Sequence, residues 1–176
     1  MLFKLKNGKQ VEIKKMDNSI AVEQFLKHIS KIVLERPEPF INLKKPPSLK
    51  EEKKWLINSK AEIKKGNLIH LVALDGNEIV GSTEARRKPH RDSDKAEIGI
   101  AISKKYRNQG LGKKLLKEII KEAKSKFKPK IIYLTVIAGN TDALRVYEKL
   151  GFKEVARLPK WQKVRGKYHD FVYMKL

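Results

Sequence analysis

Apolar and polar residues alternate at the start of the chain and then change to a helical spacing. Residues 3–13 alternate with a period of two around Asn7-Gly8, a pattern that predicts a small hairpin or an edge strand. From Ile20 to Val33 the apolar residues recur at helical intervals, which predicts a helix. We expect Ser19 to cap this helix and its end to fall near Arg36, because two prolines follow.

A second helix is predicted after a proline-containing loop. Ser48 is followed three residues later by Glu51, which is the spacing of a capping box. Apolar residues then recur at helical intervals up to Ile63. Gly66 stands where a glycine commonly ends a helix.

Beyond residue 67, short apolar runs alternate with helical segments. Asp75-Gly76-Asn77 separates two such runs and predicts a hairpin, while 111–127 has the spacing of an amphipathic helix. A short helix capped by Asn140 or Thr141 is expected to run to Leu150. The strands expected here are 68–74, 78–85, 96–102, 131–137, 152–158 and 168–174. The chain, 1–176, is therefore predicted to form a single mixed α/β domain.

Length and composition agree with that prediction. A chain of 176 residues with 40% hydrophobic and 35% charged residues suits one globular domain. No run approaches the roughly 18 apolar residues that span a bilayer, and the first residues lack the apolar stretch of a secretory signal. There is no cysteine, which excludes disulfides, thiolate metal sites and cysteine nucleophiles. We expect a cytoplasmic protein with no membrane attachment.

The net charge of +21 is the most unusual feature of the composition. Such a surplus attracts polyanions through counterion release and predicts weak association with nucleic acid or the ribosome. A composition rich in Lys, Glu and Ile is also thermophile-like, so the charge has a second explanation that needs no partner. The lysines are spread along the whole chain, and both explanations stay open.

The segment 107–112, Arg107-Asn108-Gln109-Gly110-Leu111-Gly112, joins a predicted strand to a predicted helix. The first N–H groups of a helix have no partner within it, and with the helix dipole they bind anions. Gly110 and Gly112 would let a diphosphate approach the backbone, and Arg107 would add charge. The alternative is a simple turn that feeds a helix.

Two motifs, within residues 97–112 and 134–152, resemble those of the GNAT superfamily of N-acetyltransferases. The first is Glu97-Ile98-Gly99-Ile100-Ala101-Ile102 followed by Arg107-x-x-Gly110-x-Gly112. The second is Leu134-Thr135-Val136 followed by Asn140, Ala143 and Tyr147-Glu148-Lys149-Leu150-Gly151-Phe152. The segments 48–56 and 166–174 are similar to members that act on protein N-termini or small amines. The resemblance implies a twisted, mostly antiparallel sheet of about seven strands flanked by about four helices.

The same resemblance implies an acetyl-CoA site, residue by residue. The backbone of Ile100, Ala101 and Ile102 would pair with the pantetheine arm like a further strand. Asn140 would contact the cofactor near its pantetheine, and Tyr147 would protonate the leaving thiolate. Main-chain N–H groups of the loop would hold the pyrophosphate; its residues are Arg107, Asn108, Gln109, Gly110, Leu111 and Gly112.

Transfer of an acetyl group to an amine also requires a proton acceptor and a donor for the developing oxyanion. Thr135 stands where several protein-acetylating members of the family carry a glutamate, so that base is missing here. Glu97 and Glu84 are the remaining acidic residues on the central strands; we favour Glu97, with water as a third possibility. A strand N–H around Ile100 is a candidate for the oxyanion. Tyr147 has an alternative role as a core aromatic.

The acceptor is the least determined part of the reaction. A protein N-terminus or a lysine side chain is favoured, by direct attack within a ternary complex. A small amine such as a polyamine, an antibiotic or an amino acid is the first alternative, and a basic module that binds nucleic acid or the ribosome is the second. The four histidines lack ligand spacing, so no metal is expected, and the choice between monomer and homodimer stays open.

Overall fold

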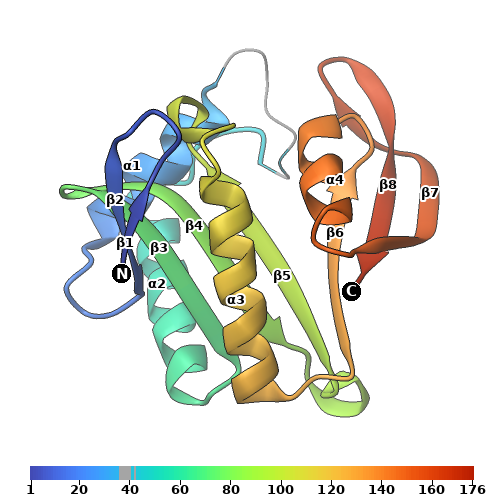
Figure 1. Cartoon of the computed structure of the whole chain (residues 1–176), viewed down its shortest axis with the longest axis horizontal. Helices are drawn as coiled ribbons and strands as arrows, with labels where there is room; N and C mark the ends of the chain where they lie inside the picture. Colours follow the sequence, from blue (N-terminus) through green and yellow to red (C-terminus); the bar gives the residue numbers. More distant parts are fainter. Residues whose placement is uncertain (36–40, 42) are drawn as a thin grey trace.

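Eight strands form one sheet in the order β1-β2-β3-β4-β5-β6-β8-β7 (Figure 1). The computed structural model describes residues 1–35, 41 and 43–176. Every neighbouring pair of strands is antiparallel except β5 and β6. The strands are β1 Leu2–Lys4, β2 Gln10–Lys15, β3 Leu68–Asp75, β4 Glu78–Arg87, β5 Lys95–Ile102, β6 Ile131–Ile137, β7 Lys153–Val164 and β8 Lys167–Lys175. The predicted fold class is confirmed, with eight strands in place of about seven.

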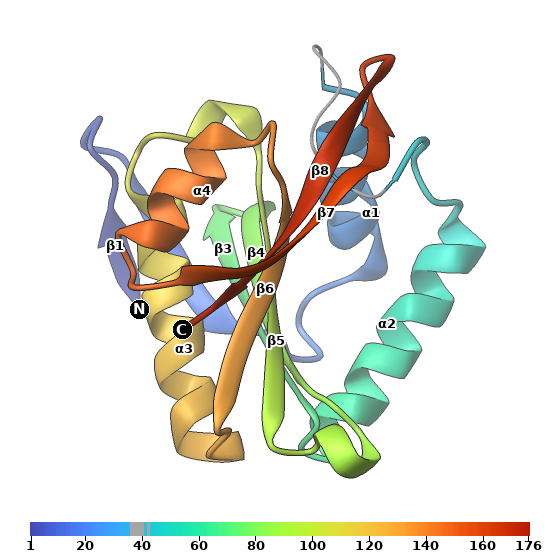
Figure 2. The ribbon, with the colours of Figure 1, turned by 90° about the vertical axis from the view of Figure 1, so that its right-hand side faces the viewer.

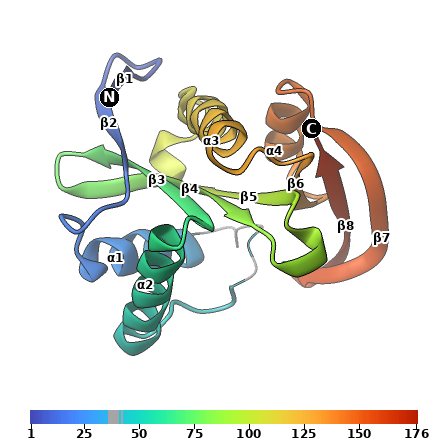
Figure 3. The same ribbon diagram turned by 90° about the horizontal axis from the view of Figure 1, so that it is seen from below.

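Helices cover both faces of the sheet. Helices α3 (Leu111–Phe127) and α4 (Thr141–Glu148) lie on one face, and α1 (Val22–Val33) and α2 (Leu49–Lys64) lie on the other. Figure 2 shows the two pairs on opposite sides, and Figure 3 shows the same layers from below. Two short 3-10 turns, His90–Asp92 and Lys104–Tyr106, flank β5.

Helix α3 is the centre of the larger hydrophobic core. Its stripe of Leu111, Leu115, Leu116 and Ile119 is almost fully buried, as the amphipathic pattern predicts. Each such side chain stabilises the fold by about 1.5–3 kcal/mol when it leaves water. Both the helix and strand β6 have the predicted bounds.

The N-terminal part differs from prediction in how its first helix begins. Ser19 does not cap α1; its hydroxyl bonds Asp17 and Lys14, and the N-cap residue is Ala21. The Gln24 side chain accepts the Ala21 N–H instead. The helix ends at Val33, before the expected end near Arg36. Arg36 and the two prolines at 37 and 39 lie outside the described residues.

Several predicted turns and caps are confirmed. Ser48 and Glu51 form the capping box of α2, and Gly66 follows that helix in the left-handed region with a φ of 78°. Asn140 caps α4 through its side chain. The last hairpin, β7–β8, is longer than predicted and turns at Gly166. Within the described part of the chain, no helix is both long and apolar enough to cross a membrane.

Candidate active site

Strands β5 and β6 are paired at one end only. Their parallel pairing covers Lys95–Ile131, Ala96–Ile132 and Glu97–Tyr133, and the later residues of each strand have no partner on the other. Figure 1 shows the two strands meeting at the foot of the sheet and diverging above it. Helix α3 begins at the diverging end, because the loop that follows β5 leads directly into it.

The backbone of β5 turns alternate residues toward this opening. The Ser103 N–H donates to the Val80 carbonyl at 3.0 Å, so Ser103 and Ala101 direct their backbone groups to β4. Ile100 and Ile102 then direct theirs to the β6 side. A ligand strand in the opening would bond Ile100 and the Ile102 N–H, whereas the backbone groups of Ala101 are bonded to β4.

The loop before α3 leaves the start of that helix uncapped. Gly110 is the N-cap residue, with a φ of 86° that favours glycine, and no side chain bonds the free N–H groups. The first helical bond to this residue comes from Lys114 N–H, which donates to the Gly110 carbonyl. The N–H groups of residues 111–113 therefore lack helical partners, which is the arrangement that the predicted anion site requires.

The N-terminal hairpin supports this loop. Gln109 accepts the Asn7 N–H on its side chain at 3.1 Å and the Lys6 N–H on its carbonyl at 3.3 Å. Gln109 was predicted as a cofactor-binding residue, and its side chain is turned to the hairpin. This contact joins residues about 100 positions apart, so no local pattern in the sequence could have indicated it.

The side chain of Arg107 fixes the loop. Its Nε donates to the Ile102 carbonyl at 2.9 Å, and its guanidinium pairs with Glu35 at 2.6 Å. Glu35 also accepts the Lys104 N–H at 3.0 Å. A direct contribution of Arg107 to anion binding stays a prediction, since the structure gives this side chain two bonds within the protein. Glu35 is a residue of the site that sequence reasoning missed.

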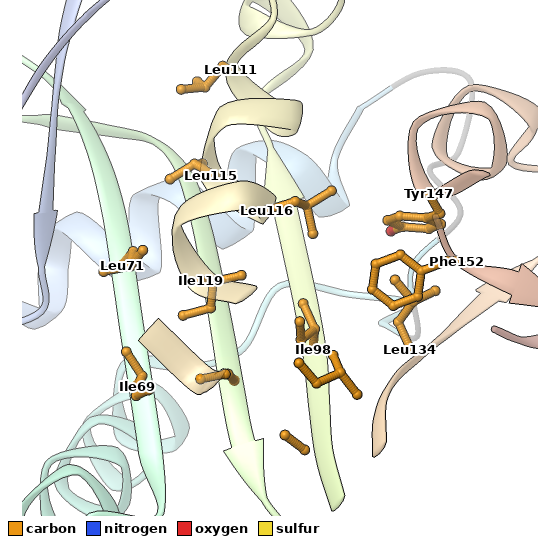
Figure 4. Packing of buried hydrophobic residues seen from close by; sticks show 14 of the residues in the cluster. Ile69, Leu71, Ile98, Leu111, Leu115, Leu116, Ile119, Leu134, Tyr147 and Phe152 are labelled. Atoms are coloured by element: carbon orange, nitrogen blue, oxygen red, sulfur yellow. The ribbon is translucent and has the colours of Figure 1, made fainter. Parts of the chain in front are cut away.

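Tyr147 lies on α4, across the opening from β5. The residue is 7% exposed, and its ring packs edge-on against Phe152 with centroids 6.0 Å apart. Figure 4 shows its hydroxyl on the side of the ring that faces β5. Burial raises the pKa of Tyr147 to about 12, so the phenol keeps its proton at neutral pH. The position suits both predicted roles, core aromatic and proton donor.

Asn140 is the N-cap residue of α4, one of the two caps that the sequence predicted. Its side-chain oxygen accepts the Ala143 N–H at 3.3 Å and caps α4. The amide N–H₂ group is a donor on the same side chain. A cofactor contact by Asn140 stays a prediction.

The two candidate bases differ in their surroundings. Glu97 lies at the last paired position of β5 and bonds Lys88 at 3.0 Å. Glu84 lies opposite Gly99, and its Cγ is 3.6 Å from where a Gly99 Cβ would be. Burial raises the pKa of Glu84 above its usual range; nearby Arg86 opposes this shift and Glu97 adds to it.

Glu84 faces the α1–α2 side of the sheet together with a residue that the sequence did not indicate. His70 of β3 is opposite Glu84 in the strand pairing, and its Nδ1 lies 3.9 Å from a Glu84 oxygen. Trp55 of α2 and Phe25 of α1 pack against the His70 ring. No group of three or more His, Asp or Glu side chains that could hold a metal occurs in the described ranges 1–35, 41 and 43–176.

The fold and the site define a mixed α/β protein whose sheet opens between two parallel strands, with an uncapped helix N-terminus beside the opening. Comparison with known proteins identifies the class. The chain belongs to the Acetyltransferase (GNAT) family, whose model matches residues 31–152. Acetyl-CoA is the cosubstrate of this family.

Relatives and solved structures agree with this assignment. The L-amino acid N-acetyltransferase AaaT of Escherichia coli is 31% identical over 106 residues, 59% of this chain and 65% of that protein. An N-alpha-acetyltransferase of Sulfurisphaera tokodaii is 40% identical over 58 residues, 33% of this chain and 35% of that protein. The structure of yncA from Salmonella typhimurium with acetyl-CoA has a TM-score of 0.80 at 18% identity, covering 96% and 94% of the two chains, and so shares the fold. The matched regions span less than two thirds of both relatives.

Proposed function

We propose that this chain, as one domain over 1–176, transfers an acetyl group from acetyl-CoA to a primary amine, most readily a protein N-terminus. The observation that carries the proposal is the divergence of β5 and β6 beside the uncapped start of α3. The N–H groups of 108–113 would hold the pyrophosphate, and Ile100 with Ile102 would pair with the pantetheine arm.

The reaction is a direct attack within a ternary complex. The amine attacks the thioester carbonyl, and the Ile100 N–H, which faces the opening, would donate to the oxygen as it gains negative charge. Holding both substrates in line contributes about 7–11 kcal/mol when orientation is good. Tyr147 would then give its proton to the departing thiolate.

Glu84 is the base that the geometry favours over Glu97. It lies beside Gly99, one residue from the Ile100 backbone, whereas Glu97 lies at the closed end of the strand pair and is bonded to Lys88. The burial that raises the Glu84 pKa brings it closer to the pH at which a general base works best.

A groove on the α1–α2 side supports a peptide as the acceptor. It has a volume of about 380 Å³ and lies between the α1–α2 connection and the β7–β8 hairpin. Trp161 contributes an exposed aromatic surface to it, and Lys44 and Lys163 are its charged residues. Its described lining is Ile41, Leu43, Lys44, Trp161, Gln162, Lys163, Val164 and Phe171. These residues, with the net charge of +21, favour neutral or acidic peptides over polyamines.

Transfer is tested by release of free thiol from acetyl-CoA in the presence of single acceptors. The panel comprises peptides with free or blocked α-amines, with and without lysine, in neutral, acidic and basic versions, together with free amino acids and spermine. We expect turnover with free α-amine peptides, best for neutral and acidic ones. Turnover only with spermine or free amino acids would contradict the peptide acceptor, and no turnover with any amine would contradict transferase function.

A second candidate function, association with a polyanion, is supported by the exposed face of α3. Four lysines recur along it at helical spacing and lie within about 80° of arc at 100° per residue, and Lys128 follows directly after the helix. They are Lys113, Lys117, Lys121, Lys124 and Lys128, all exposed and without an ion pair in the described part of the chain. The two glutamates of the helix pair with Lys114 and Lys15 instead. We propose that this lysine stripe contacts an RNA backbone.

The stripe is tested with labelled single-stranded RNA at several salt concentrations. One variant changes Lys117, Lys121, Lys124 and Lys128 to Gln, and a matched variant changes Lys50, Lys53, Lys54 and Lys64 of α2 to Gln. Both remove four charges. We expect the α3 variant alone to lower the salt slope of log affinity by about 0.7 for each lysine. Equal losses in both variants would assign the binding to bulk charge.

A further inference from the structure

His70 is a buried polar side chain without a hydrogen-bond partner in the part of the chain that the structure describes. The residue is 6% exposed, and neither Nδ1 nor Nε2 has a partner among the described residues. Phe25 and Trp55 contact the ring edge-on, each with centroids 5.7 Å away. An unpartnered buried polar group is destabilising, and an apolar residue of the same shape would avoid that cost. A histidine at this place therefore calls for a functional reason.

The position of His70 in the sheet indicates this reason, because His70, Glu84 and Gly99 lie side by side on three neighbouring strands. His70 is opposite Glu84, and Glu84 is opposite Gly99 beside the opening. The Nδ1 atom is 3.9 Å from Glu84 Oε2, somewhat beyond hydrogen-bond distance. The Glu84 side chain is 31% exposed and the His70 side chain 5%, so the carboxylate is the partner with room to move.

We propose that His70 is a positioning residue for the base, donating a hydrogen bond from Nδ1 to the Glu84 carboxylate when an acceptor amine is bound. The inference rests on the proposed function. The aromatic contacts fix the ring, and the ring then fixes the carboxylate beside Gly99. Glu84 takes the proton from the attacking nitrogen, and His70 keeps its own proton throughout.

The surrounding charges are consistent with a neutral donor. On β4, Arg86 lies 3.7 Å from Glu84. Burial, together with nearby His28 and Arg86, lowers the pKa of His70 to about 4, so the ring is neutral at pH 7. The charge of Glu97 on β5 raises the pKa of Glu84. Glu52 is the buried carboxyl on α2, one turn before Trp55.

A donor to the carboxylate has a predictable effect on the pH profile. A hydrogen bond to the charged form lowers the pKa of Glu84, so its removal raises that pKa. The limb of kcat/KM that rises with pH then moves to higher pH. An α-amine titrates near 8 and contributes to the same limb, but that contribution is constant when every variant is assayed with one peptide.

Three variants of the full chain test the proposal. His70→Phe keeps the shape and removes both nitrogens, His70→Asn keeps an amide donor near the Nδ1 position, and His70→Gln moves it toward the Nε2 position. For His70→Phe we expect a thermal midpoint equal to or above that of the unchanged protein, a loss of about tenfold in kcat, and a limb moved to higher pH. KM for acetyl-CoA should change less than about twofold, and His70→Asn should recover more of the rate than His70→Gln.

Two outcomes would overturn the proposal. One is an unchanged kcat and pH limb in His70→Phe, and the other is a folded His70→Asn that is as slow as His70→Phe. Glu84→Gln separates this failure from that of the base. If Glu84→Gln is inactive and His70→Phe is unchanged, only the role of His70 is wrong. If Glu84→Gln keeps full activity, the base assignment fails and the role of His70 fails with it.

Discussion

At the scale of single residues, the bonds that a side chain makes within the protein limit the role that it can have in the reaction. Asn140 and Arg107 were predicted for the cofactor, and both have partners within the protein: Asn140 caps α4 and Arg107 pairs with Glu35. Among the described residues, the ring of Tyr147 is held by packing. Side chains held by packing keep a polar group available for a substrate.

The two carboxylates give the first test at this scale. Glu84→Gln should lower kcat by about 100-fold or more, because general-base catalysis contributes about 10²–10⁴-fold. Glu97→Gln is the matched control on the neighbouring strand and should cost less than about threefold, since it removes the ion pair with Lys88 and a contribution to the Glu84 pKa that is smaller than that of burial. Steady-state kinetics with one peptide measures both. A larger loss in Glu97→Gln would restore Glu97 as the base.

Tyr147→Phe gives the second residue-scale test. The ring packing against Phe152 is kept, so the thermal midpoint should stay nearly unchanged. Loss of the phenolic proton should lower kcat by about tenfold or more while KM for acetyl-CoA changes little. Turnover equal to that of the unchanged protein would leave Tyr147 as a core aromatic only.

At the scale of elements, the site is formed where the diverging end of β5 meets the first turn of α3. Gly112 is the second residue of α3, and a Cβ there would meet Ile100 and Ile102 at 3.9 Å, an ordinary contact. Gly110 differs, because its φ of 86° makes any side chain strained. A substitution at Gly112 therefore tests ligand binding without straining the backbone, whereas a substitution at Gly110 would change the backbone as well.

Gly112→Asp should separate stability from binding. An acidic residue in the first turn of a helix is favourable by about 0.3–1 kcal/mol, so the thermal midpoint should hold or rise slightly. The same charge repels a pyrophosphate, so acetyl-CoA affinity by calorimetry should fall about 100-fold or more. Gly112→Asn is the uncharged control of equal size and should bind more tightly than Gly112→Asp. Equal affinity in the two variants would argue against an anion at this helix end.

At the scale of the whole molecule, the sequence indicated the elements but not the contacts between them. The bounds of α3 and β6 were predictable because each has a strong local period. The Gln109 contact to the hairpin, the Arg107 pair with Glu35 and the row from His70 to Glu84 join distant segments. Their residues carry no local pattern, so only the packed fold reveals them.

Acid should destabilise the whole fold through its two buried histidines. Burial lowers the pKa of His28 and of His70 to about 4, below the usual 6.5, so the unfolded chain binds protons that the folded chain does not. Stability should therefore fall as the pH drops from about 6.5 to about 4, by about 3 kcal/mol at most for each histidine. Thermal midpoints across this range measure the fall, and His70→Phe should show a smaller one. The same pH dependence in both proteins would contradict a buried neutral His70.

The central claim is that acetyl-CoA lies in the β5–β6 opening with its pyrophosphate on the start of α3. Titration of the ¹⁵N-labelled protein with acetyl-CoA, followed by amide chemical shifts, tests this directly. The largest changes should fall on the N–H groups of 108–113 and of Ile100 and Ile102, with small changes along the distal part of α3 from Lys117 to Lys128. Changes concentrated on that distal stretch, on α2, or nowhere in 98–113 would contradict the claim.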